Sequence, residues 1–151
     1  MIGLLQRVLR ASAQVGDDTV GEIGFGLLMM VGIERKDGQV EADRLIDRVL
    51  HYRMFADDQG RMNCSLVDTR GGLLLVPQFT LVADTHKGTR PSFSTAANPE
   101  QGEYWFNYLV GRMRELHKGV QSGRFGADMR ISLVNEGPVT FWLRVAPGGK
   151  L

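Results

Sequence analysis

Two polar side chains, Gln78 and Thr80, follow an apolar run in the segment LLLVPQFTLVADT. In an extended strand they would share one face with Val76, because alternate side chains point to the same side. Polar groups at the end of a buried strand are often placed to contact a ligand. An edge strand that ends in solvent-facing residues is the alternative, and Pro77 fits either one.

Thr80 carries a hydroxyl that could act as a nucleophile. A hydroxyl needs a neighbouring base for activation near neutral pH, and the sequence places none beside it. His86 lies six residues further on, across an expected loop. A covalent role for Thr80 is therefore the less favoured interpretation.

Side chains that bind metals or carry redox chemistry are few and separated. Cys64 is the only cysteine, so neither a disulfide nor a thiolate cluster can form within one chain. His51, His86 and His117 lack partners at the spacing of a recognised metal site. The segment GEIGFG lacks the spacing of a dinucleotide-binding loop. We therefore expect no metal and no cofactor.

A Gly-Pro pair interrupts the strand-like segment LVNEGPVTFWLRV, residues 133–145. Gly137 weakens a strand interior, and Pro138 can donate no ladder hydrogen bond. A plain hairpin turn is the simplest explanation. A shaped loop with a cis bond is the other, because an X-Pro bond favours trans by only about 0.5–1 kcal/mol.

Several short strands and two helices are predicted to hold these segments. Residues 1–24 are typical of a hairpin and residues 26–33 of a buried strand. Further strands are expected in residues 61–67, 71–82, 123–134 and 139–145. One amphipathic helix is predicted from Val40 to Phe55, and a second from Pro99 to Leu116 with Asn98 as its cap. This order predicts an α+β fold with a mainly antiparallel, barrel-like sheet and two main helices.

Length and composition indicate one soluble domain over residues 1–151, with 146–151 as a frayed tail. The chain has 43% hydrophobic and 23% charged residues and a formal charge of +1. That charge argues against holding long nucleic acid by electrostatics alone, but it allows binding of one RNA end. No segment approaches the roughly 20 apolar residues of a membrane span, and Gln6 and Arg7 suit a secretory signal poorly. We expect a cytoplasmic protein with no membrane partner.

Two motifs together resemble the D-aminoacyl-tRNA deacylase family. PQFTL at 77–81 is similar to its Ser-Gln-Phe-Thr motif, and NEGPVT at 135–140 to its Gly-Pro-Val-Thr motif. The resemblance covers nearly the whole chain, including RPSFS at 90–94. It implies a homodimer that hydrolyses D-aminoacyl-tRNA and mischarged glycyl-tRNA. In such a dimer Gly137 and Pro138 would enter the partner's pocket through a cis bond and reject L substrates.

The resemblance also implies roles for individual residues. Gln78, Phe79 and Thr80 map to the catalytic motif. The resemblance implies that backbone N–H groups near Gln78 and Phe79 support an oxyanion while the 2′-hydroxyl of the tRNA assists the attacking water. Gly137 and Pro138 map to chiral selection, and Arg7 would hold their loop. The expected pocket lining is Phe125, Met129 and Ala97.

Pro77 departs from the family pattern, because Ser usually stands there. The substitution removes a hydroxyl and a backbone N–H from the pocket edge. A related branch that acts on misacylated L-alanyl-tRNA resembles this chain at Pro77, so relaxed chirality stays an alternative. Two others are an RNA-end binding module without hydrolysis and an esterase for small D-amino acid esters.

Overall fold

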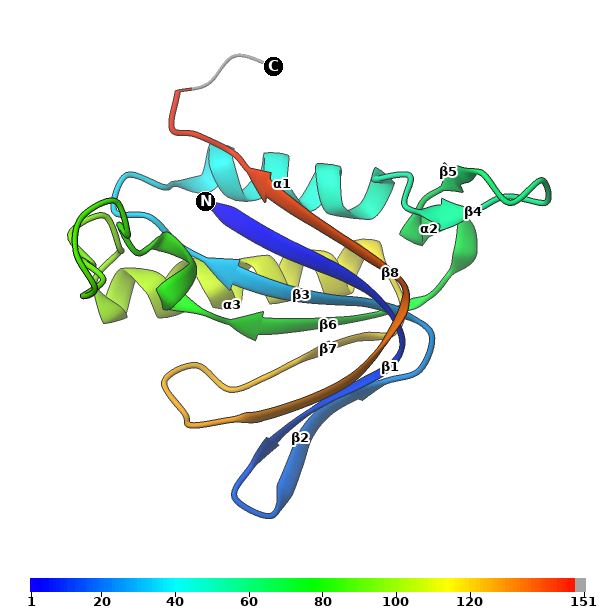
Figure 1. The fold of residues 1–151 in the computed structure, drawn as a ribbon, viewed down its shortest axis with the longest axis horizontal. Coiled ribbons are helices and arrows are strands. Elements are labelled where there is room, and N and C mark those ends of the chain that lie inside the picture. Colours follow the sequence, from blue (N-terminus) through cyan, green and yellow to red (C-terminus); the bar gives the residue numbers. More distant parts are fainter. Residues whose placement is uncertain (149–151) are drawn as a thin grey trace.

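The computed structural model describes residues 1–148. Its elements follow one another along the chain as β1 (Ile2–Val15), β2 (Asp18–Ile23), β3 (Gly26–Gly32), α1 (Gln39–His51), β4 (Phe55–Ala56), β5 (Met62–Cys64), α2 (Leu66–Thr69), β6 (Gly72–Pro77), the 3-10 helix η1 (Phe79–Val82), α3 (Pro99–Leu116), β7 (Val120–Ser122) and β8 (Arg130–Arg144). Figure 1 shows one strongly bent sheet with two long helices beside it.

The long strand β1 is the centre of the six-stranded sheet. It pairs antiparallel with β2, β3 and β8, whereas β6 pairs in parallel with both β3 and β7. The antiparallel expectation therefore holds for the pairs of β1, and the two parallel pairs were not predicted. Parallel neighbours need a crossover connection, which α1 and α3 supply.

The sheet bends until its two ends approach each other at Gly21 of β2 and Ser122 of β7. A Cβ on Gly21 would lie 2.8 Å from the Ser122 carbonyl oxygen and 2.9 Å from Leu74 Cδ1. Only glycine allows so close an approach. The predicted barrel-like core is confirmed as a nearly closed barrel, and its inside is filled by small and aliphatic side chains: Val8, Ala11, Ala13, Ile23, Leu28, Leu74 and Val76.

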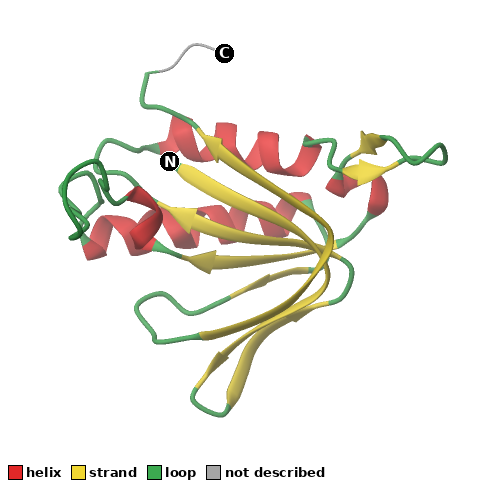
Figure 2. Ribbon diagram, viewed as in Figure 1, coloured by secondary structure: helices red, strands yellow, loops and turns green. Residues whose placement is uncertain are grey.

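Helices α1 and α3 cover the outer face of the sheet (Figure 2). A larger apolar cluster lies between them and the strands, and includes Leu45, Phe106 and Leu109. The start of α3 is as predicted, because the Asn98 side chain accepts a hydrogen bond from the Gln101 N–H at 2.8 Å. The first helix is shorter than the predicted 40–55, because the backbone becomes extended at Tyr52.

Three strand predictions were wrong in part. Residues 61–67 contain only the short β5, because Ser65 and Asp68 cap each other and start α2. The segment 123–134 is a loop until Arg130, where pairing with β1 begins. Residues 71–82 form a strand only to Pro77.

The ends of the chain lie beside β1. The Met1 ammonium donates to Asp37 at 2.6 Å and to the Val145 carbonyl at 2.8 Å, and it is fully buried. After β8, the Gly148 N–H donates to Glu41. The remaining residues of the predicted tail, 149–151, lie outside the described residues.

The close approach of the paired strands β3 and β6 at Gly26 and Gly72 yields a stability prediction. A Cβ on Gly26 would lie 1.9 Å from the Gly72 carbonyl oxygen, and Gly26 has φ +157°, where L side chains are strained. We expect Gly26→Ala to lower the free energy of unfolding by more than about 2 kcal/mol in urea titrations. Gly24→Ala is the matched control, because nothing lies within 4 Å of its Cβ. Equal effects of the two substitutions would show that the close approach at Gly26 does not require glycine.

Candidate functional site

The segment from Pro77 to Thr80 leaves the sheet where Pro77 ends β6. The Gln78 N–H makes a last bond to the Val31 carbonyl at 2.7 Å, and the chain then turns into η1, in which the Leu81 N–H donates to the Gln78 carbonyl. The predicted common strand face for Gln78 and Thr80 is therefore wrong. Their side chains meet for another reason, because the turn brings residues two apart together.

The Thr80 hydroxyl donates to the Gln78 side-chain oxygen at 2.8 Å. An amide oxygen is not a base that can activate a hydroxyl. His86 is engaged elsewhere, with its Nδ1 2.6 Å from Asp84 Oδ1. The geometry therefore gives Thr80 no activating partner among residues 1–148.

The first turn of η1 presents two adjacent backbone donors. In a 3-10 helix the first N–H groups have no partner inside the helix, and here these belong to Phe79 and Thr80. Both residues are exposed. The Gln78 N–H, which the sequence interpretation included, is used by Val31. The donors that could support an oxyanion are therefore those of Phe79 and Thr80.

The Gly137–Pro138 pair lies in a wide bulge of β8. Gln6 pairs with Thr140 and Val8 with Asn135, so the four residues 136–139 stand opposite Arg7 alone. The Gly137–Pro138 peptide is cis, Gly137 has φ +123°, and both residues are exposed. The plain hairpin turn is thus wrong, and the shaped loop is what the fold contains.

Arg7 lies under this bulge, half-buried in the central strand. Its Nε donates to the Glu136 carbonyl at 3.1 Å, and its NH1 nitrogen donates to the Met54 carbonyl at 2.8 Å. The guanidinium therefore connects the bulge to the turn that follows α1. A Cβ on Gly137 would lie 3.0 Å from the Arg7 NH2 nitrogen, which leaves no room for a larger residue there.

The two motifs do not meet within one chain. Gly137 lies opposite Arg7 of β1. Arg7 pairs with Leu27 of β3, and Leu27 pairs with Leu73 of β6, so the bulge is at the same height in the sheet as Leu73. Gln78 is five residues beyond Leu73 and three strands away from β8, which places the two motifs about 20 Å apart. In Figure 1 the bend of β8 lies at the right, whereas the green segment that follows β6 lies at the left.

The other predicted site residues lie in three places. Pro77 and Met129 are neighbours on either side of Gly123, whose missing Cβ would lie 3.6 Å from Pro77 Cδ and 2.7 Å from Met129 Sδ. Phe125 instead packs on Phe106 of α3, with ring centroids 6.2 Å apart. The Ala97 N–H donates to the Ile33 carbonyl at 3.0 Å, at the end of β3.

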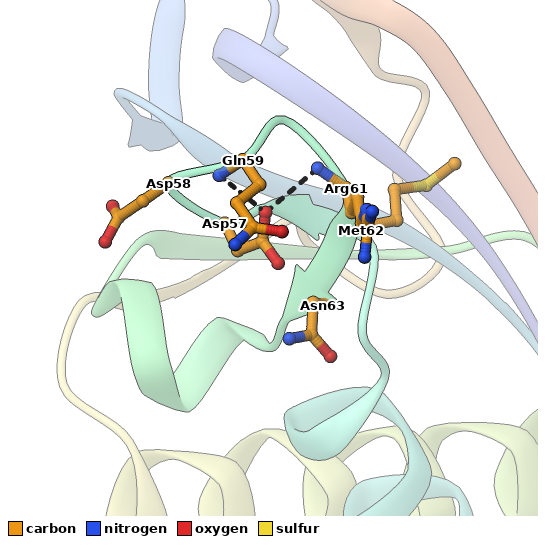
Figure 3. Close-up of a pocket in the computed structure, with 6 residues that line it drawn as sticks. All are labelled: Asp57, Asp58, Gln59, Arg61, Met62 and Asn63. Carbon is orange, nitrogen blue, oxygen red and sulfur yellow. Dashed lines mark hydrogen bonds between the residues drawn. The ribbon is translucent and has the colours of Figure 1, made fainter.

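Two hollows on the surface of residues 1–148 were considered as binding sites, and neither is lined by Gln78, Phe79 or Thr80. The larger, of about 490 Å³, lies at the tip of the β4–β5 hairpin (Figure 3). There Asp57 accepts hydrogen bonds from the N–H groups of Arg61 and Gln59, and the bond from Arg61 lowers its pKa. Asp57 thus shapes its own turn. The second hollow, of about 340 Å³, shares only Phe125 with the predicted site.

The sequence interpretation gave no role to two features that lie beside the predicted residues. The Phe93 ring packs against Phe79 with centroids 5.1 Å apart, and both rings are partly exposed. Phe93 could have been singled out, because the segment RPSFS is part of the family resemblance. The Met54 carbonyl that binds Arg7 had no such signal, because every residue has a carbonyl.

In residues 1–148 no group of three or more His, Cys, Asp or Glu residues is placed to hold a metal ion. Over the same range no helix has the length and apolar character needed to cross a membrane.

Comparison with known proteins gives a consistent result. A protein family described as D-Tyr-tRNA(Tyr) deacylase matches residues 4–144. The D-aminoacyl-tRNA deacylase of Xanthomonas oryzae pv. oryzae (strain MAFF 311018) is 59% identical over 145 residues, which are 95% of this chain and 99% of that protein. That of Paracidovorax citrulli (strain AAC00-1) is 56% identical over 149 residues, 99% of this chain and 96% of that protein.

Solved structures share the fold. A protein described as c-Myc DNA Unwinding Element Binding Protein superposes with a TM-score of 0.92 at 34% identity, covering 97% of this chain and 99% of that one. A probable eukaryotic D-amino acid tRNA deacylase superposes with a TM-score of 0.80 at 16% identity, covering 94% and 97%. At that identity the second likeness concerns the fold alone.

The bridge made by Arg7 can be tested by removing its donors. We expect Arg7→Met to leave the Glu136 and Met54 carbonyls without their partner and to lower the free energy of unfolding by about 1–3 kcal/mol. Amide exchange of residues 135–140 should become faster. Arg10→Met is the control, because Arg10 lies in the same strand and is exposed. If both variants exchange at the wild-type rate in this segment, Arg7 does not hold the bulge.

Proposed function

The chain belongs to the D-Tyr-tRNA(Tyr) deacylase family, and we propose that it hydrolyses the ester bond of D-aminoacyl-tRNA to release D-amino acid and tRNA. The observation that carries the proposal is near-full-length identity of 56–59% to proteins named D-aminoacyl-tRNA deacylase. Glycine on a wrong tRNA is the second substrate, since glycine has no L side chain to reject. The cytoplasm, where tRNA is charged, is the expected location.

The active enzyme is a two-fold dimer in which the bulge of one protomer enters the site of the other. Three features support this. The bulge is exposed, it lies about 20 Å from the Gln78 segment of its own chain, and β8 has a paired neighbour on only one side in the described structure. A two-fold axis repeats the same contact twice and so completes both sites at once.

Rejection of L substrates is steric. The exposed backbone of Gly137 and Pro138 forms a wall that leaves room for a hydrogen atom at the L position of the bound α-carbon. A substrate that places a side chain there meets the bulge and is excluded. Repulsion discriminates more strongly than the roughly 1–3 kcal/mol available from one added apolar contact.

The chemical step relies on positioning and electrostatics. The 2′-hydroxyl of the terminal adenosine assists the attacking water, and the N–H groups of Phe79 and Thr80 stabilise the developing oxyanion. The Thr80 hydroxyl positions the Gln78 amide, to which it donates. An aminoacyl ester is already reactive, so a modest contribution from the protein suffices.

Pro77 is the feature that leaves relaxed chirality open. It stands next to Met129 at the edge of the segment and offers no N–H. Deacylation of misacylated L-alanyl-tRNA is therefore the second candidate activity. The rate of hydrolysis of misacylated L-alanyl-tRNA, divided by that of D-alanyl-tRNA, distinguishes relaxed from strict chirality. If Pro77 relaxes chirality, this ratio is higher for wild type than for Pro77→Ser.

A nucleic-acid binding module without hydrolysis is the remaining candidate. It is favoured by the name of the neighbour that resembles this chain at 34% identity, a DNA unwinding element binding protein. Turnover of D-tyrosyl-tRNA by the purified protein excludes this candidate. Inhibition of that turnover by uncharged tRNA also excludes an esterase that needs no RNA.

Gly137 provides a direct test of chiral selection. We expect Gly137→Ala to displace the bulge, because the new Cβ would lie 2.9 Å from Val139 Cγ2 and 3.0 Å from Arg7. The ratio of kcat/KM for D- over L-tyrosyl-tRNA should fall at least about tenfold, equal to about 1.4 kcal/mol. Gly60→Ala is the control, because Gly60 also has positive φ but an open surrounding. An unchanged ratio would remove the bulge from chiral selection.

Thr80 provides the test of the chemical step. We expect Thr80→Ala to keep kcat within about tenfold of wild type, because no base activates its hydroxyl. A D-tyrosyl-tRNA ending in 2′-deoxyadenosine should be hydrolysed far more slowly by both proteins. If Thr80→Ala abolished turnover while the deoxy substrate reacted normally, Thr80 would be the nucleophile.

A further inference from the structure

A loop without helix or strand lies directly after η1 and is fastened to it. Asp84 and Ser92 exchange two backbone hydrogen bonds of 2.8 and 2.9 Å, which close the loop at its base. The Thr95 hydroxyl donates to the Val82 carbonyl, the last residue of η1. Gly88, with φ +67°, turns the chain at the tip. The loop is therefore held beside Gln78 to Thr80.

This loop is a positively charged surface in a nearly neutral protein. Between Asp84 and Glu100 the sequence has no acidic residue, but it has Lys87 and Arg90, and both are exposed. Neither makes a hydrogen bond or an ion pair with residues 1–148. Asp84 is the one nearby carboxylate in the loop, and the N–H and then the ring of His86 lower its pKa by hydrogen bonding. That carboxylate is occupied at the base of the loop, away from the tip.

An aromatic pair borders the same surface. Phe79 is 60% and Phe93 is 39% exposed, with their rings tilted by 54°. Two large apolar rings that are exposed and in contact form a patch of the kind that can mark an interaction site. Exposed aromatic faces beside free cations are the combination that binds single-stranded nucleic acid, because bases stack on the rings and phosphates contact the cations.

We propose that Lys87, Arg90 and Phe93 bind the single-stranded 3′ end of the tRNA on the side that precedes the terminal adenosine. Phosphates of the preceding nucleotides lie against Lys87 and Arg90, and one of their bases stacks on Phe93. This inference rests on the proposed function, because the same RNA end must present its ester at Gln78 to Thr80. An acidic peptide would use the cations but not the ring faces.

The test compares two substrates that differ in the phosphates they carry. D-tyrosyl-tRNA has the full 3′ end, whereas D-tyrosyl-adenosine has the ester and no preceding nucleotide. For Lys87→Ala/Arg90→Ala we expect the ratio of kcat/KM, tRNA over adenosine ester, to fall at least about tenfold. Raising the salt concentration from about 50 to 200 mM should lower kcat/KM for tRNA in both proteins. Because the variant contacts two fewer phosphates, its fold decrease should be about seven times smaller than that of the wild type. Phe93→Leu should lower the same ratio by about fivefold or more.

Lys118→Ala is the matched control. Lys118 is exposed and follows α3, beyond the opposite end of β6. The ratio for this variant should stay at the wild-type value. If Lys87→Ala/Arg90→Ala behaves as this control does, the loop does not bind the tRNA end and the inference is wrong. If the wild type hydrolyses neither substrate, the proposed function itself fails.

A competition experiment identifies the class of partner. The trinucleotide CCA should inhibit hydrolysis of D-tyrosyl-tRNA by wild type, and it should inhibit the Lys87→Ala/Arg90→Ala variant less. Oligoglutamate of equal charge should inhibit far more weakly than CCA. Equal inhibition by the two would mean that the surface binds anions of any kind, which overturns the assignment to RNA.

Discussion

The two hydrogen bonds that Arg7 donates to the carbonyls of Glu136 and Met54 are the interaction on which the site depends. They hold the bulge of β8, in which four residues stand opposite Arg7, whereas in a regular strand only one residue would stand there. A guanidinium suits this task because its donors point in fixed, divergent directions from one plane. Lysine, with one compact ammonium, cannot hold two separate carbonyls in the same way. The central strand thus both organises the sheet and shapes the exposed Gly-Pro backbone.

A second constraint is distance. The register of the sheet keeps the bulge and the η1 turn about 20 Å apart in each chain. In the proposed mechanism, however, the bulge contacts the α-carbon of the substrate while the η1 turn contacts the ester carbonyl next to it. The proposed dimer would resolve this, since the bulge of one protomer would then reach the turn of the other. The backbone next to both parts is anchored in the core of the nearly closed barrel, through Val8 beside Arg7 and Val76 beside Pro77. This matters because steric rejection fails when the wall can yield.

Much of this arrangement was predictable from particular residues. Asn98 and Pro99 marked the start of α3, and the pair Gly137–Pro138 marked the break in the pairing of β8. The turn after Pro77 was missed because FTLV continues a strand pattern, and only the loss of pairing after Val31 ends it. The parallel pairing of β6 with β3 and β7 depends on contacts between strands that are separated in the sequence by α1 and α3. Local periodicity carries no information about such distant contacts. The bond from Arg7 to Met54 could not be predicted, because a backbone carbonyl leaves no mark in a sequence.

The most direct test of the two-chain site is chemical cross-linking between the bulge and the η1 turn. A chain carrying Phe79→Cys and Pro138→Cys, with Cys64→Ser to remove the native thiol, would be treated with a short bismaleimide whose reach is well below about 20 Å. Each cysteine substitution alone is the control for links between like positions. A two-chain site predicts that the doubly substituted protein migrates at twice the chain mass on a denaturing gel. Migration at the mass of a single chain, together with a monomer in sedimentation, would contradict it.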